Sequence, residues 1–392
     1  MSASISDSEF SITRGGFLYR LLKTIGVILP EKPSILRQIL FFVLLSYIPL
    51  ALLSLFEGLH WGSDIDIPFF KEFASAIRFL LVIPLLIVSE MIVDKRVKLT
   101  LNQFERSNLL TESGKAKFDM ARLKADRLGE SVWGDLVIIL IIVLNIFFQI
   151  HGNTIELTTW AFPNPADPYQ HSLAGMWAAY VSYPIFQFMI LRWIWRWIIW
   201  SRMMKMISRA DLAVIPTHPD QSGGLGFLGE PPMPFSIYTL ALSLVFSGIM
   251  AERVIFQDLN LQEHYPLIAL FAILCVLINL LPLIPFISVL NKARLQGIYD
   301  YHALISKHHR AFEKKWISSG KSEQEEILGS PDASSAADIQ AVYEAVKKMS
   351  PYPFNLKSMM ATLVLVLFPL LFVFGLEIPL VDLLKKLLGF FF

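Results

Sequence analysis

Long apolar runs alternate with shorter polar segments along the whole chain. A helix needs about 20 apolar residues to cross roughly 30 Å of hydrocarbon. Segments of about that length predict spans over residues 38–57, 73–93, 134–151, 174–198, 235–256, 266–290 and 357–376. Because only helices and closed barrels satisfy their backbone in lipid, the pattern predicts an all-α integral membrane protein. We expect a bundle of about seven transmembrane helices with cytoplasmic helical extensions.

The Lys and Arg residues lie in alternate loops between these spans. The chain up to Arg37 holds five of them, residues 94–133 nine, residues 192–234 five and residues 291–357 ten, which is 29 of 34. The loop over residues 152–175 has none. Cytoplasmic loops collect Lys and Arg, so we expect a cytoplasmic N-terminus and an outer C-terminus in a plasma membrane, the inner membrane if the chain is bacterial. This orientation disfavours a G-protein-coupled receptor.

Composition narrows the class of protein further. Hydrophobic residues make up 54% of the chain and charged residues only 17%, against about a quarter charged in soluble proteins. The lipid bilayer is therefore the first expected partner. A net charge of +1 without a basic tract predicts no nucleic acid partner. The single cysteine, Cys275, lies in an apolar run, which excludes a disulfide framework within the chain and predicts a small core residue. No cofactor is expected.

The spans divide the chain into parts with separate predicted roles. The parts are a cytoplasmic leader (1–37), spans one and two (38–93), a cytoplasmic helical hairpin (94–133), spans three and four (134–198), a cytoplasmic glycine-rich loop (199–234), spans five and six (235–290), cytoplasmic helices and a linker (291–356), span seven (357–376) and an outer amphipathic tail (377–392).

Two terminal segments have amphipathic patterns. In the leader, one helical face is predicted to lie on the inner leaflet through Phe17, Leu18, Leu21, Leu22 and Ile25. In the tail, Asp382, Lys385 and Lys386 share a face opposite leucines, which predicts a helix lying flat on the outer interface.

After span six the sequence shows heptad spacing. The a and d positions of the heptads are Leu295, Ile298, His302, Ile305, His309, Phe312 and Trp316. This face either packs on the chain's own 94–133 hairpin or forms a seam between subunits of a homo-oligomer. Protonation of His302 and His309 would place charge in that seam, which leaves pH sensing or metal binding open. A linker over 319–335 and a short helix capped by Ser335 are predicted to follow.

The most individual motif is the glycine-rich loop with His218-Pro-Asp220. Gly223, Gly224 and Gly226 free the backbone for positive φ values, and successive N–H groups favour an anion-binding nest. His218 and Asp220 add a titratable donor and an acceptor. We predict either a rigid turn that returns the chain to the membrane or a ligand-binding or gating loop.

Charged residues within spans are costly and mark candidate functional positions. Arg78 and Glu90 lie in span two on either side of Pro84, a predicted kink, and Asp135 lies near the inner end of span three. They either snorkel to the interface or face the interior of the bundle.

Polar residues at helical spacing predict a pathway through the bundle. The candidate pathway residues are Asn145, Gln149, Gln187, Arg192, Arg196 and Asn279. Arg192 and Arg196 share a stripe beside Trp193, Trp197 and Trp200, typical of an aromatic belt with snorkelling arginines or of an inward stripe that attracts a small ion or anion. Pro282 and Pro285 follow Asn279 and predict a broken helix.

Four histidines, at positions 60, 151, 171 and 264, lie in or beside the outer segments near acidic residues. Their spacing lacks the HxH and HxxxH patterns of metal sites, so no metal site is predicted, although a shared outer site stays an alternative.

The motif HPDQSGGLGFLG after a Trp- and Arg-rich span, with the ending FPLLFVFGLEIPLVDLLKKLL, resembles a group of uncharacterised bacterial polytopic inner-membrane proteins. These share an H-P-D-x-x-G-G-L-G-F-L element. The resemblance implies a polytopic inner-membrane protein and carries no activity.

Three functions remain open from the sequence. Recurring polar positions favour an ion channel or a small-solute transporter. The cytoplasmic helices also fit a signalling or scaffold protein that binds a partner. A membrane enzyme acting on lipid would use His218 and Asp220 as acid and base, with Glu90 or Asp135 as a second carboxylate, but no catalytic motif occurs and an enzyme is the less favoured class.

Overall fold

The computed structural model describes residues 10–13, 15–28, 34–62, 65–152, 157–164, 170–231, 233–318 and 331–377. Within these ranges every regular element is a helix, apart from two isolated β-bridges. This confirms the all-α class. The predicted outer tail over 377–392 and most of the predicted linker over 319–335 lie outside the described residues.

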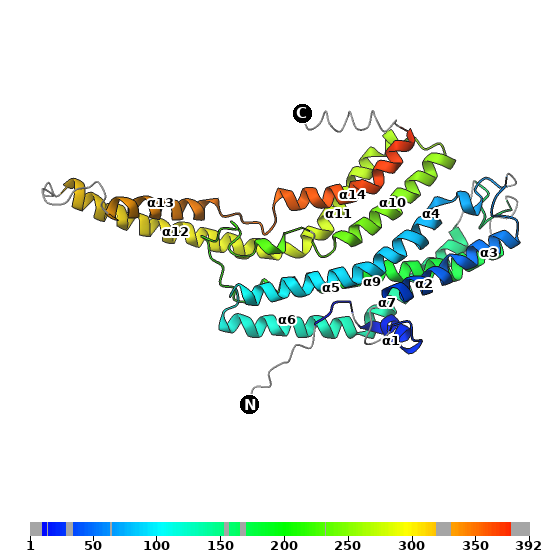
Figure 1. Cartoon of the computed structure of the whole chain (residues 1–392), viewed down its shortest axis with the longest axis horizontal. Coiled ribbons are helices and arrows are strands. Elements are labelled where there is room, and N and C mark those ends of the chain that lie inside the picture. Colours follow the sequence, from blue (N-terminus) through cyan, green and yellow to red (C-terminus); the bar gives the residue numbers. More distant parts are fainter. Residues whose placement is uncertain are drawn as a thin grey trace.

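The helices are arranged as a long bundle with an arm at one end (Figure 1). Their bounds are α1 Gly16–Thr24, α2 Ile35–Ser46, α3 Ile48–Phe56, α4 Phe73–Ala76, α5 Ile83–Arg106, α6 Glu112–Glu130, α7 Val132–Gly152, α8 Leu173–Trp177, α9 Tyr183–Ile207, α10 Ser236–Phe256, α11 Tyr265–Leu280, α12 Pro285–Glu313, α13 Pro331–Lys348 and α14 Leu356–Glu377. Short 3₁₀ and π-helical turns join several of them: η1 Phe69–Lys71, η2 Ile77–Val82, η3 Ala178–Ser182, η4 Gly226–Leu228, η5 Leu261–His264, η6 Leu281–Leu283 and η7 Lys314–Ser318.

Six helical stretches among the described residues are long and apolar enough to span a membrane, or up to seven if a bent pair is one span. The six are Ile35–Phe56, Phe73–Arg106, Leu173–Ile207, Ser236–Phe256, Leu261–Leu283 and Leu356–Leu376. The bent pair joins α6 to α7 at 45°. Predicted span three coincides with α7, whose Leu140, Leu144 and Phe148 are exposed, as expected of a face that meets lipid.

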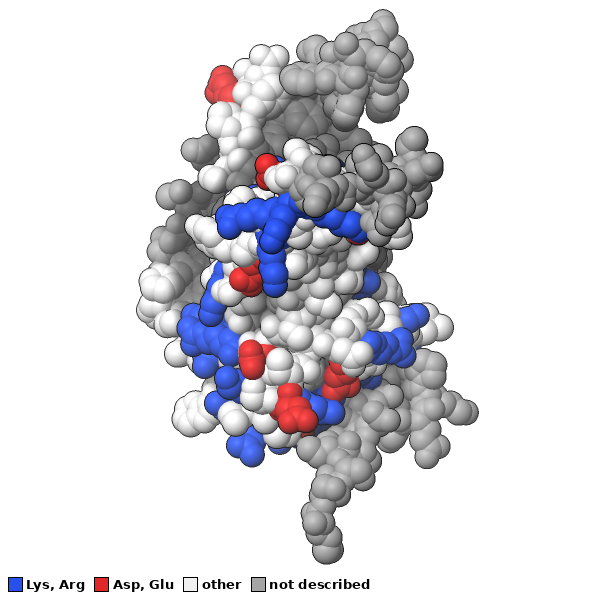
Figure 2. Space-filling model, turned by 90° about the vertical axis from the view of Figure 1, so that its left-hand side faces the viewer, with Lys and Arg blue, Asp and Glu red and all other residues white. Residues whose placement is uncertain are grey.

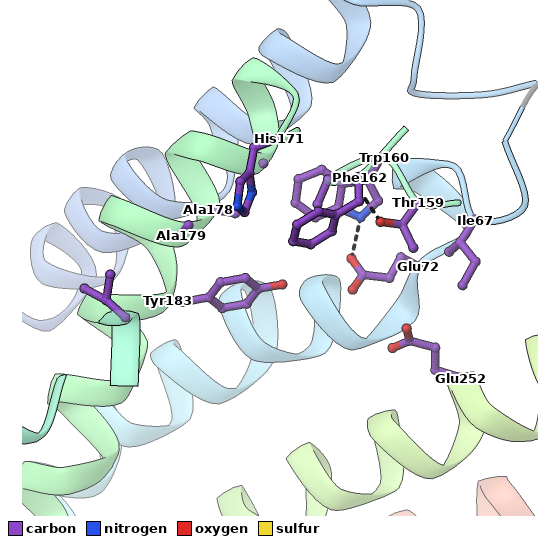
Figure 3. Close-up of a pocket in the computed structure, with 13 residues that line it drawn as sticks. Ile67, Glu72, Thr159, Trp160, Phe162, His171, Ala178, Ala179, Tyr183 and Glu252 are labelled. Carbon is purple, nitrogen blue, oxygen red and sulfur yellow. Dashed lines mark hydrogen bonds between the residues drawn. The ribbon is translucent and has the colours of Figure 1, made fainter. Parts of the chain in front are cut away.

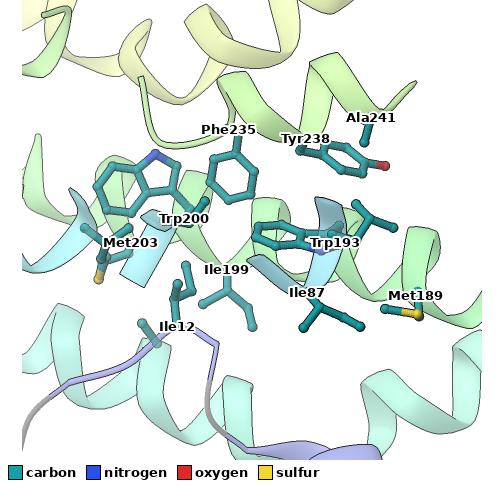
Figure 4. Packing of buried hydrophobic residues seen from close by; sticks show 14 of the residues in the cluster. Ile12, Ile87, Met189, Trp193, Ile199, Trp200, Met203, Phe235, Tyr238 and Ala241 are labelled. Atoms are coloured by element: carbon teal, nitrogen blue, oxygen red, sulfur yellow. The ribbon is translucent and has the colours of Figure 1, made fainter. Parts of the chain in front are cut away.

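Tryptophans of α9 form the centre of the core rather than an interfacial belt. Trp193 and Trp200 are each only 2% exposed. Trp193 stacks on Tyr238 with ring centroids 5.9 Å apart, and its edge meets Phe235 (Figure 4). Trp197 donates its indole N–H to the carbonyl of Ile278 at 2.6 Å. The predicted aromatic belt is therefore wrong for Trp193 and Trp200, because their rings are buried among other helices.

Two π-helical turns widen the spans at the same level of the bundle. The turn η2 precedes Pro84, and η3 precedes Pro184. Proline lacks an N–H and its ring collides with the carbonyl one turn earlier, so a wider turn relieves both problems. Phe79 of η2 packs against Tyr183, which directly follows η3, with ring centroids 5.8 Å apart. The predicted kink at Pro84 is thus a local widening of the helix.

The predicted cytoplasmic hairpin is formed by the inner end of α5 and by α6, which meet through Phe104 and Phe118. The turn lies at residues 107–111, with positive φ at Asn108. Gly114 lies inside α6. A Cβ there would come within 2.2 Å of the Asp211 carbonyl oxygen, so this glycine permits close backbone contact.

The heptad helix is confirmed as α12, but its partner differs from the prediction. It packs along α13, and together they form the arm that projects from the bundle (Figure 1). Packing on the 94–133 hairpin is therefore wrong for the arm, although Phe286 at the start of α12 contacts Phe104 of α5, with ring centroids 6.2 Å apart. His302 lies beside the ring of Tyr343 of α13, with centroids 6.1 Å apart, whereas His302 and His309 are themselves exposed.

The helix after the linker begins earlier than predicted. Because α13 starts at Pro331, residues 331–335 are helical and Ser335 is not a cap. Proline suits the first helical turn, where its missing N–H has no partner to lose. The Ser335 hydroxyl instead donates to the Asp332 carbonyl at 2.9 Å and contacts Nε2 of His308 at 3.3 Å.

The leader forms the predicted helix, α1, and its apolar face divides between two surroundings. Leu22 is buried in the core, whereas Phe17, Leu21 and Ile25 are exposed. The helix therefore binds the bundle through one side and leaves an apolar side open.

Candidate functional site

A cavity of about 290 Å³ lies at the end of the bundle where α4 and α9 begin and α10 ends (Figure 3). This is the end that the sequence predicts to face outward. Its walls come from five parts of the chain that are far apart in sequence. They are formed by Ile67, Glu72, Ile146, Thr159, Trp160, Ala161, Phe162, His171, Gly175, Ala178, Ala179, Tyr183 and Glu252.

The loop walls are fixed by hydrogen bonds between two segments of the chain. Asp66 and Thr158 are hydrogen-bonded to each other. The Thr158 hydroxyl donates to Oδ2 of Asp66 at 2.8 Å. The backbone N–H of Trp160 donates to the Ile67 carbonyl at 3.0 Å. Backbone hydrogen bonds from Thr158 hold the pKa of Asp66 below its usual range. The cavity wall is therefore built before any ligand arrives.

The start of α8 is tied to the same wall. The Ser172 hydroxyl donates to the Trp160 carbonyl at 2.7 Å and also caps α8 by accepting from the Gly175 N–H. Glu57 accepts from the backbone N–H groups of Leu173 and Ala174 at 2.8 and 3.1 Å, where the helix dipole favours a carboxylate. These contacts set the position of Trp160 relative to α8 and η3.

Glu72 is the central acidic group of the cavity. It is only 9% exposed, and its Oε2 accepts the indole N–H of Trp160 at 2.9 Å. Burial, together with the nearby charge of Glu252, raises the pKa of Glu72 to about 7. This carboxyl therefore gains and loses its proton in the physiological range.

Two carboxyl groups, Glu72 and Glu252, line the cavity, and no Lys or Arg in the described part of the chain does. Figure 3 shows Glu252 reaching from α10 toward Glu72. Arg78 supplies a compensating positive charge, and its guanidinium lies 5.6 Å from the centre of the Tyr183 ring, a cation–π distance. Arg78 does not line the cavity itself.

His171 adds a polar group to the aromatic wall. Its ring lies 4.4 Å from that of Phe162, and burial lowers the pKa of the imidazole, so His171 is neutral at pH 7. Its Nδ1 is buried and has no hydrogen-bond partner among the described residues. A buried polar atom without a partner is uncommon in proteins and fits a wall that receives a ligand.

The main residues of this cavity are not among those predicted from the sequence. Of the predicted intramembrane charges, only Arg78 lies beside it. Glu252 falls inside the predicted span 235–256, and its cost in lipid was the signal for an interior position. Trp160 gave no signal, because its loop has no motif.

The glycine-rich loop holds an anion from its own chain. Asp220 accepts the backbone N–H groups of Ser222, Gly224 and Gly226 at 2.8, 3.1 and 2.8 Å. Burial opposes the charge, but these hydrogen bonds hold the pKa of Asp220 below its ordinary value. His218 lies 2.8 Å from the carboxylate through Nδ1. The predicted anion nest thus exists and is filled by Asp220.

The glycines of the loop allow close packing at the junction of the bundle and the arm. Gly223 and Gly224 have φ values of 63° and 91°. A Cβ at Gly223 would lie 2.3 Å from Val214 and 3.0 Å from Met349. The carbonyl of Gln221 also accepts the Ser350 N–H at 2.6 Å. The loop thereby connects the α9–α10 segment to the chain that leads into α14, as a rigid turn does.

We expect Asp220→Ala to lower the free energy of unfolding by about 2–3 kcal/mol, because the half-buried loop N–H groups lose their acceptor. Because the pKa of Asp220 is lower in the folded protein than in the unfolded chain, this stabilisation is fully present above the ordinary pKa of aspartate. It is lost as the pH falls through the lowered pKa of the folded protein. Denaturant titrations at pH 7 and pH 3 test this, with Asp126→Ala on the exposed face of α6 as the control. Equal losses for both variants at pH 7 would contradict it.

Arg192 and Arg196 pack against the leader in the interior of the bundle. They are 8% and 3% exposed, so snorkelling is wrong for both. Arg196 pairs with Glu90 at 2.7 Å and donates to the Thr13 carbonyl at 3.0 Å. Arg192 donates to the Gly15 carbonyl at 2.8 Å. The extended segment before α1 therefore occupies the predicted inner mouth.

Asp135 fixes the start of α1. It is buried, and its Oδ2 accepts the backbone N–H of Phe17. A Cβ at Gly16, whose φ is 79°, would lie 2.9 Å from that oxygen. Glu90 and Asp135 are therefore engaged with Arg196 and α1 rather than with the glycine-rich loop.

The remaining pathway residues occupy separate places. Gln187 donates to Asn145 at 3.1 Å, which links α9 to α7. Asn279 is buried and donates to the Cys275 carbonyl at 3.1 Å and to the Thr239 hydroxyl at 3.4 Å. The side chain of Gln149 lies outside the described residues. None of the described ones lines the outer cavity.

The outer histidines are likewise dispersed. His60 packs on Phe70, and His264 contacts the Asn260 carbonyl through Nδ1 at 3.0 Å. The side chain of His151 lies outside the described residues. No group of three or more His, Cys, Asp or Glu side chains in the described part of the chain is arranged to hold a metal ion. Cys275 is buried, as predicted.

No protein-family model matches the chain, and neither a curated protein nor a solved structure matches it significantly. The function is therefore inferred from the geometry of the cavity and the inner end.

Proposed function

We propose that the chain is a multi-pass membrane transporter for a small ion or solute and that the outer cavity is its binding site. The observation that carries this proposal is Glu72, a carboxyl buried in the wall of a preformed cavity of about 290 Å³. Charged groups within membrane bundles are retained where they bind substrates or relay protons. An oligomer of this chain and a small ion as ligand remain compatible with this function.

The raised pKa of Glu72 supports coupling to protons. With a pKa of about 7, the carboxyl is neutral below pH 7 and charged above it. A charged ligand therefore exchanges with a proton at this position within the physiological range.

The closed inner end supports a transporter over an open channel. Arg196, near the middle of α9, pairs with Glu90 and donates to the Thr13 carbonyl, so side chains and backbone pack the bundle at this level. Alternating access requires a state in which the site is open to one side of the membrane and packed side chains close the path to the other side. Transport then needs the segment before α1 to move.

The charge distribution supports a cytoplasmic position for the arm and the α5–α6 turn. Figure 2 views this end and shows Lys and Arg side chains spread over it, with Asp and Glu between them. The cavity then faces outward in a plasma membrane. The H-P-D-x-x-G-G-L-G-F-L element fits the polytopic inner-membrane proteins that it resembles, and this relationship stays a prediction.

Cysteine labelling tests the orientation, because the only native cysteine is buried. In intact cells, a membrane-impermeant maleimide is expected to label Gln262→Cys in η5 and to spare Lys307→Cys in α12; both native residues are exposed. Disrupted cells should show labelling of both. Labelling of Lys307→Cys alone in intact cells would reverse the orientation.

Reconstitution in liposomes tests transport. We expect the wild-type protein to move at least one of a panel of small ions and solutes, with a rate that changes between pH 6 and pH 8. Glu72→Gln keeps the size of the side chain and removes its titration, so its rate should vary little over this range.

The matched control is Glu263→Gln, an exposed carboxyl in η5 outside the cavity, which should behave as wild type. Absence of any flux across pH and voltage would overturn the proposal, as would equal effects of Glu72→Gln and Glu263→Gln.

The arm supports a second candidate, a scaffold or an oligomerisation role. Tyr299 and Ile317 are 73% and 70% exposed on it, so both side chains are accessible to a partner. Crosslinking from Tyr299→Cys in membranes tests this role, with Lys307→Cys as the comparison. Capture of one protein from Tyr299→Cys, together with no transport in liposomes, would favour it.

A further inference from the structure

We infer that the outer cavity binds a small organic cation, a protonated amine, which competes with a proton for Glu72. This inference rests on the proposed function and names its substrate class. Three features of the cavity carry it: the sign of its charge, its aromatic walls and its size.

The charges favour a positive ligand. Two carboxyl groups, Glu72 and Glu252, line the cavity, and the indole N–H of Trp160 occupies one oxygen of Glu72. The nearest cation, Arg78, stands behind the wall against Tyr183. No Lys or Arg among the described residues lines the cavity, so a bound ammonium would meet opposite charge at its wall, whereas an anion would meet two like charges.

The aromatic walls favour an organic cation over a bare metal ion. The rings of Trp160, Phe162 and Tyr183 surround the space beside Glu72 (Figure 3). Aromatic faces attract cations and also bury alkyl groups. Nδ1 of the neutral His171, buried without a described partner, can accept an N–H of the ammonium. A hydrated metal ion would find few oxygen ligands here.

The size limits the ligand. A volume of about 290 Å³ lies at the lower end of the range of about 300–1,000 Å³ for small-molecule sites. A metabolite-sized amine fits, whereas a long peptide or an acyl chain does not.

Several other groups act on the titration of Glu72. Arg78 lies on η2, and Glu252 lies on α10 with Arg253 beside it. The charge of Glu72 also acts on Tyr183 of α9 and on Tyr47 between α2 and α3. His171 shares the cavity. Burial raises the pKa of Glu72 to about 7.

Equilibrium binding of radiolabelled butylammonium to the whole chain in phosphatidylglycerol nanodiscs tests the inference. Butanol and butyrate are the neutral and negative competitors of matched chain length. We expect butylammonium to bind at least tenfold more tightly than either. Its Kd should rise about tenfold per pH unit below pH 7, since protonation of Glu72 removes the charge that it pairs with.

Variants separate this site from non-specific uptake. Glu72→Gln should weaken binding at least tenfold at pH 8 and flatten the pH dependence, and Glu263→Gln should bind as wild type. Thermal melts confirm that both variants are folded. Nanodiscs containing phosphatidylethanolamine test whether the natural ligand is a lipid amine. If the phosphatidylethanolamine headgroup occupies the cavity, butylammonium binding is lost in these nanodiscs.

Equal binding of butanol, tighter binding of butyrate, or no binding of any probe would overturn the inference. If amine binding fails while pH-dependent flux of another solute still requires Glu72, the substrate class is wrong and the transport function stands. If binding succeeds without flux, the cavity is a receptor site and the transport function fails.

Discussion

Replacing Glu90 by alanine should lower the free energy of unfolding by about 3–5 kcal/mol, because it leaves a buried guanidinium without its counter-charge. Arg196 is 3% exposed and lies 2.7 Å from Glu90. The Thr13 carbonyl remains as a hydrogen-bond acceptor, but it carries no charge. Unfolding in mixed micelles with rising SDS content measures the loss.

Glu105→Ala is the matched control, since it removes an exposed carboxylate from the same helix and should change stability by less than about 0.5 kcal/mol. The double variant Glu90→Leu with Arg196→Met should be more stable than Glu90→Ala, because neither member of the pair is left as a buried charge without its partner. If the double variant were less stable than Glu90→Ala, the buried pair would be adding net stability and this interpretation would be wrong.

Gly175→Ala should displace the wall of the outer cavity and weaken amine binding at least tenfold. The added Cβ would lie 2.4 Å from the Ala161 carbonyl oxygen and 3.0 Å from its Cα. Both are backbone atoms next to Trp160, so the loop has to move. Overpacking of this kind costs about 1–3 kcal/mol, and the binding assay with butylammonium measures the loss of the cavity.

Gly129→Ala controls for the change of residue type. Gly129 is also helical, and a Cβ there would meet nothing within 4 Å, so alanine should stabilise α6 slightly, by up to about 1 kcal/mol. Unchanged amine binding in Gly175→Ala would show that the wall tolerates the shift.

The helical class and the positions of the spans were accessible from the sequence because they depend on local periodicity. All seven predicted segments are helical, and the α5–α6 hairpin and α12 lie where the pattern put them. Tertiary packing decided the rest. The apolar face of α12 has the same residue spacing whether α6 or α13 packs against it. Likewise, the sequence around Trp193 is the same whether its side chain lies at the membrane interface or in the core of the bundle.

The cavity could not be predicted because its groups meet only in three dimensions. Glu72, Trp160 and Glu252 lie on separate elements, and no spacing rule joins them. The glycine-rich loop shows the opposite case. The glycines show which backbone conformations the loop needs. The sequence pattern does not fix the turn that places the Asp220 carboxylate in the nest.

The extended segment before α1 has a consequence for biosynthesis. Thr13 and Gly15 emerge early from the ribosome, yet their partners Arg192 and Arg196 are made roughly 180 residues later. The segment therefore waits until α9 has entered the membrane. We expect closure of the inner end to be a late step of assembly, after the spans that carry the cavity are already in place.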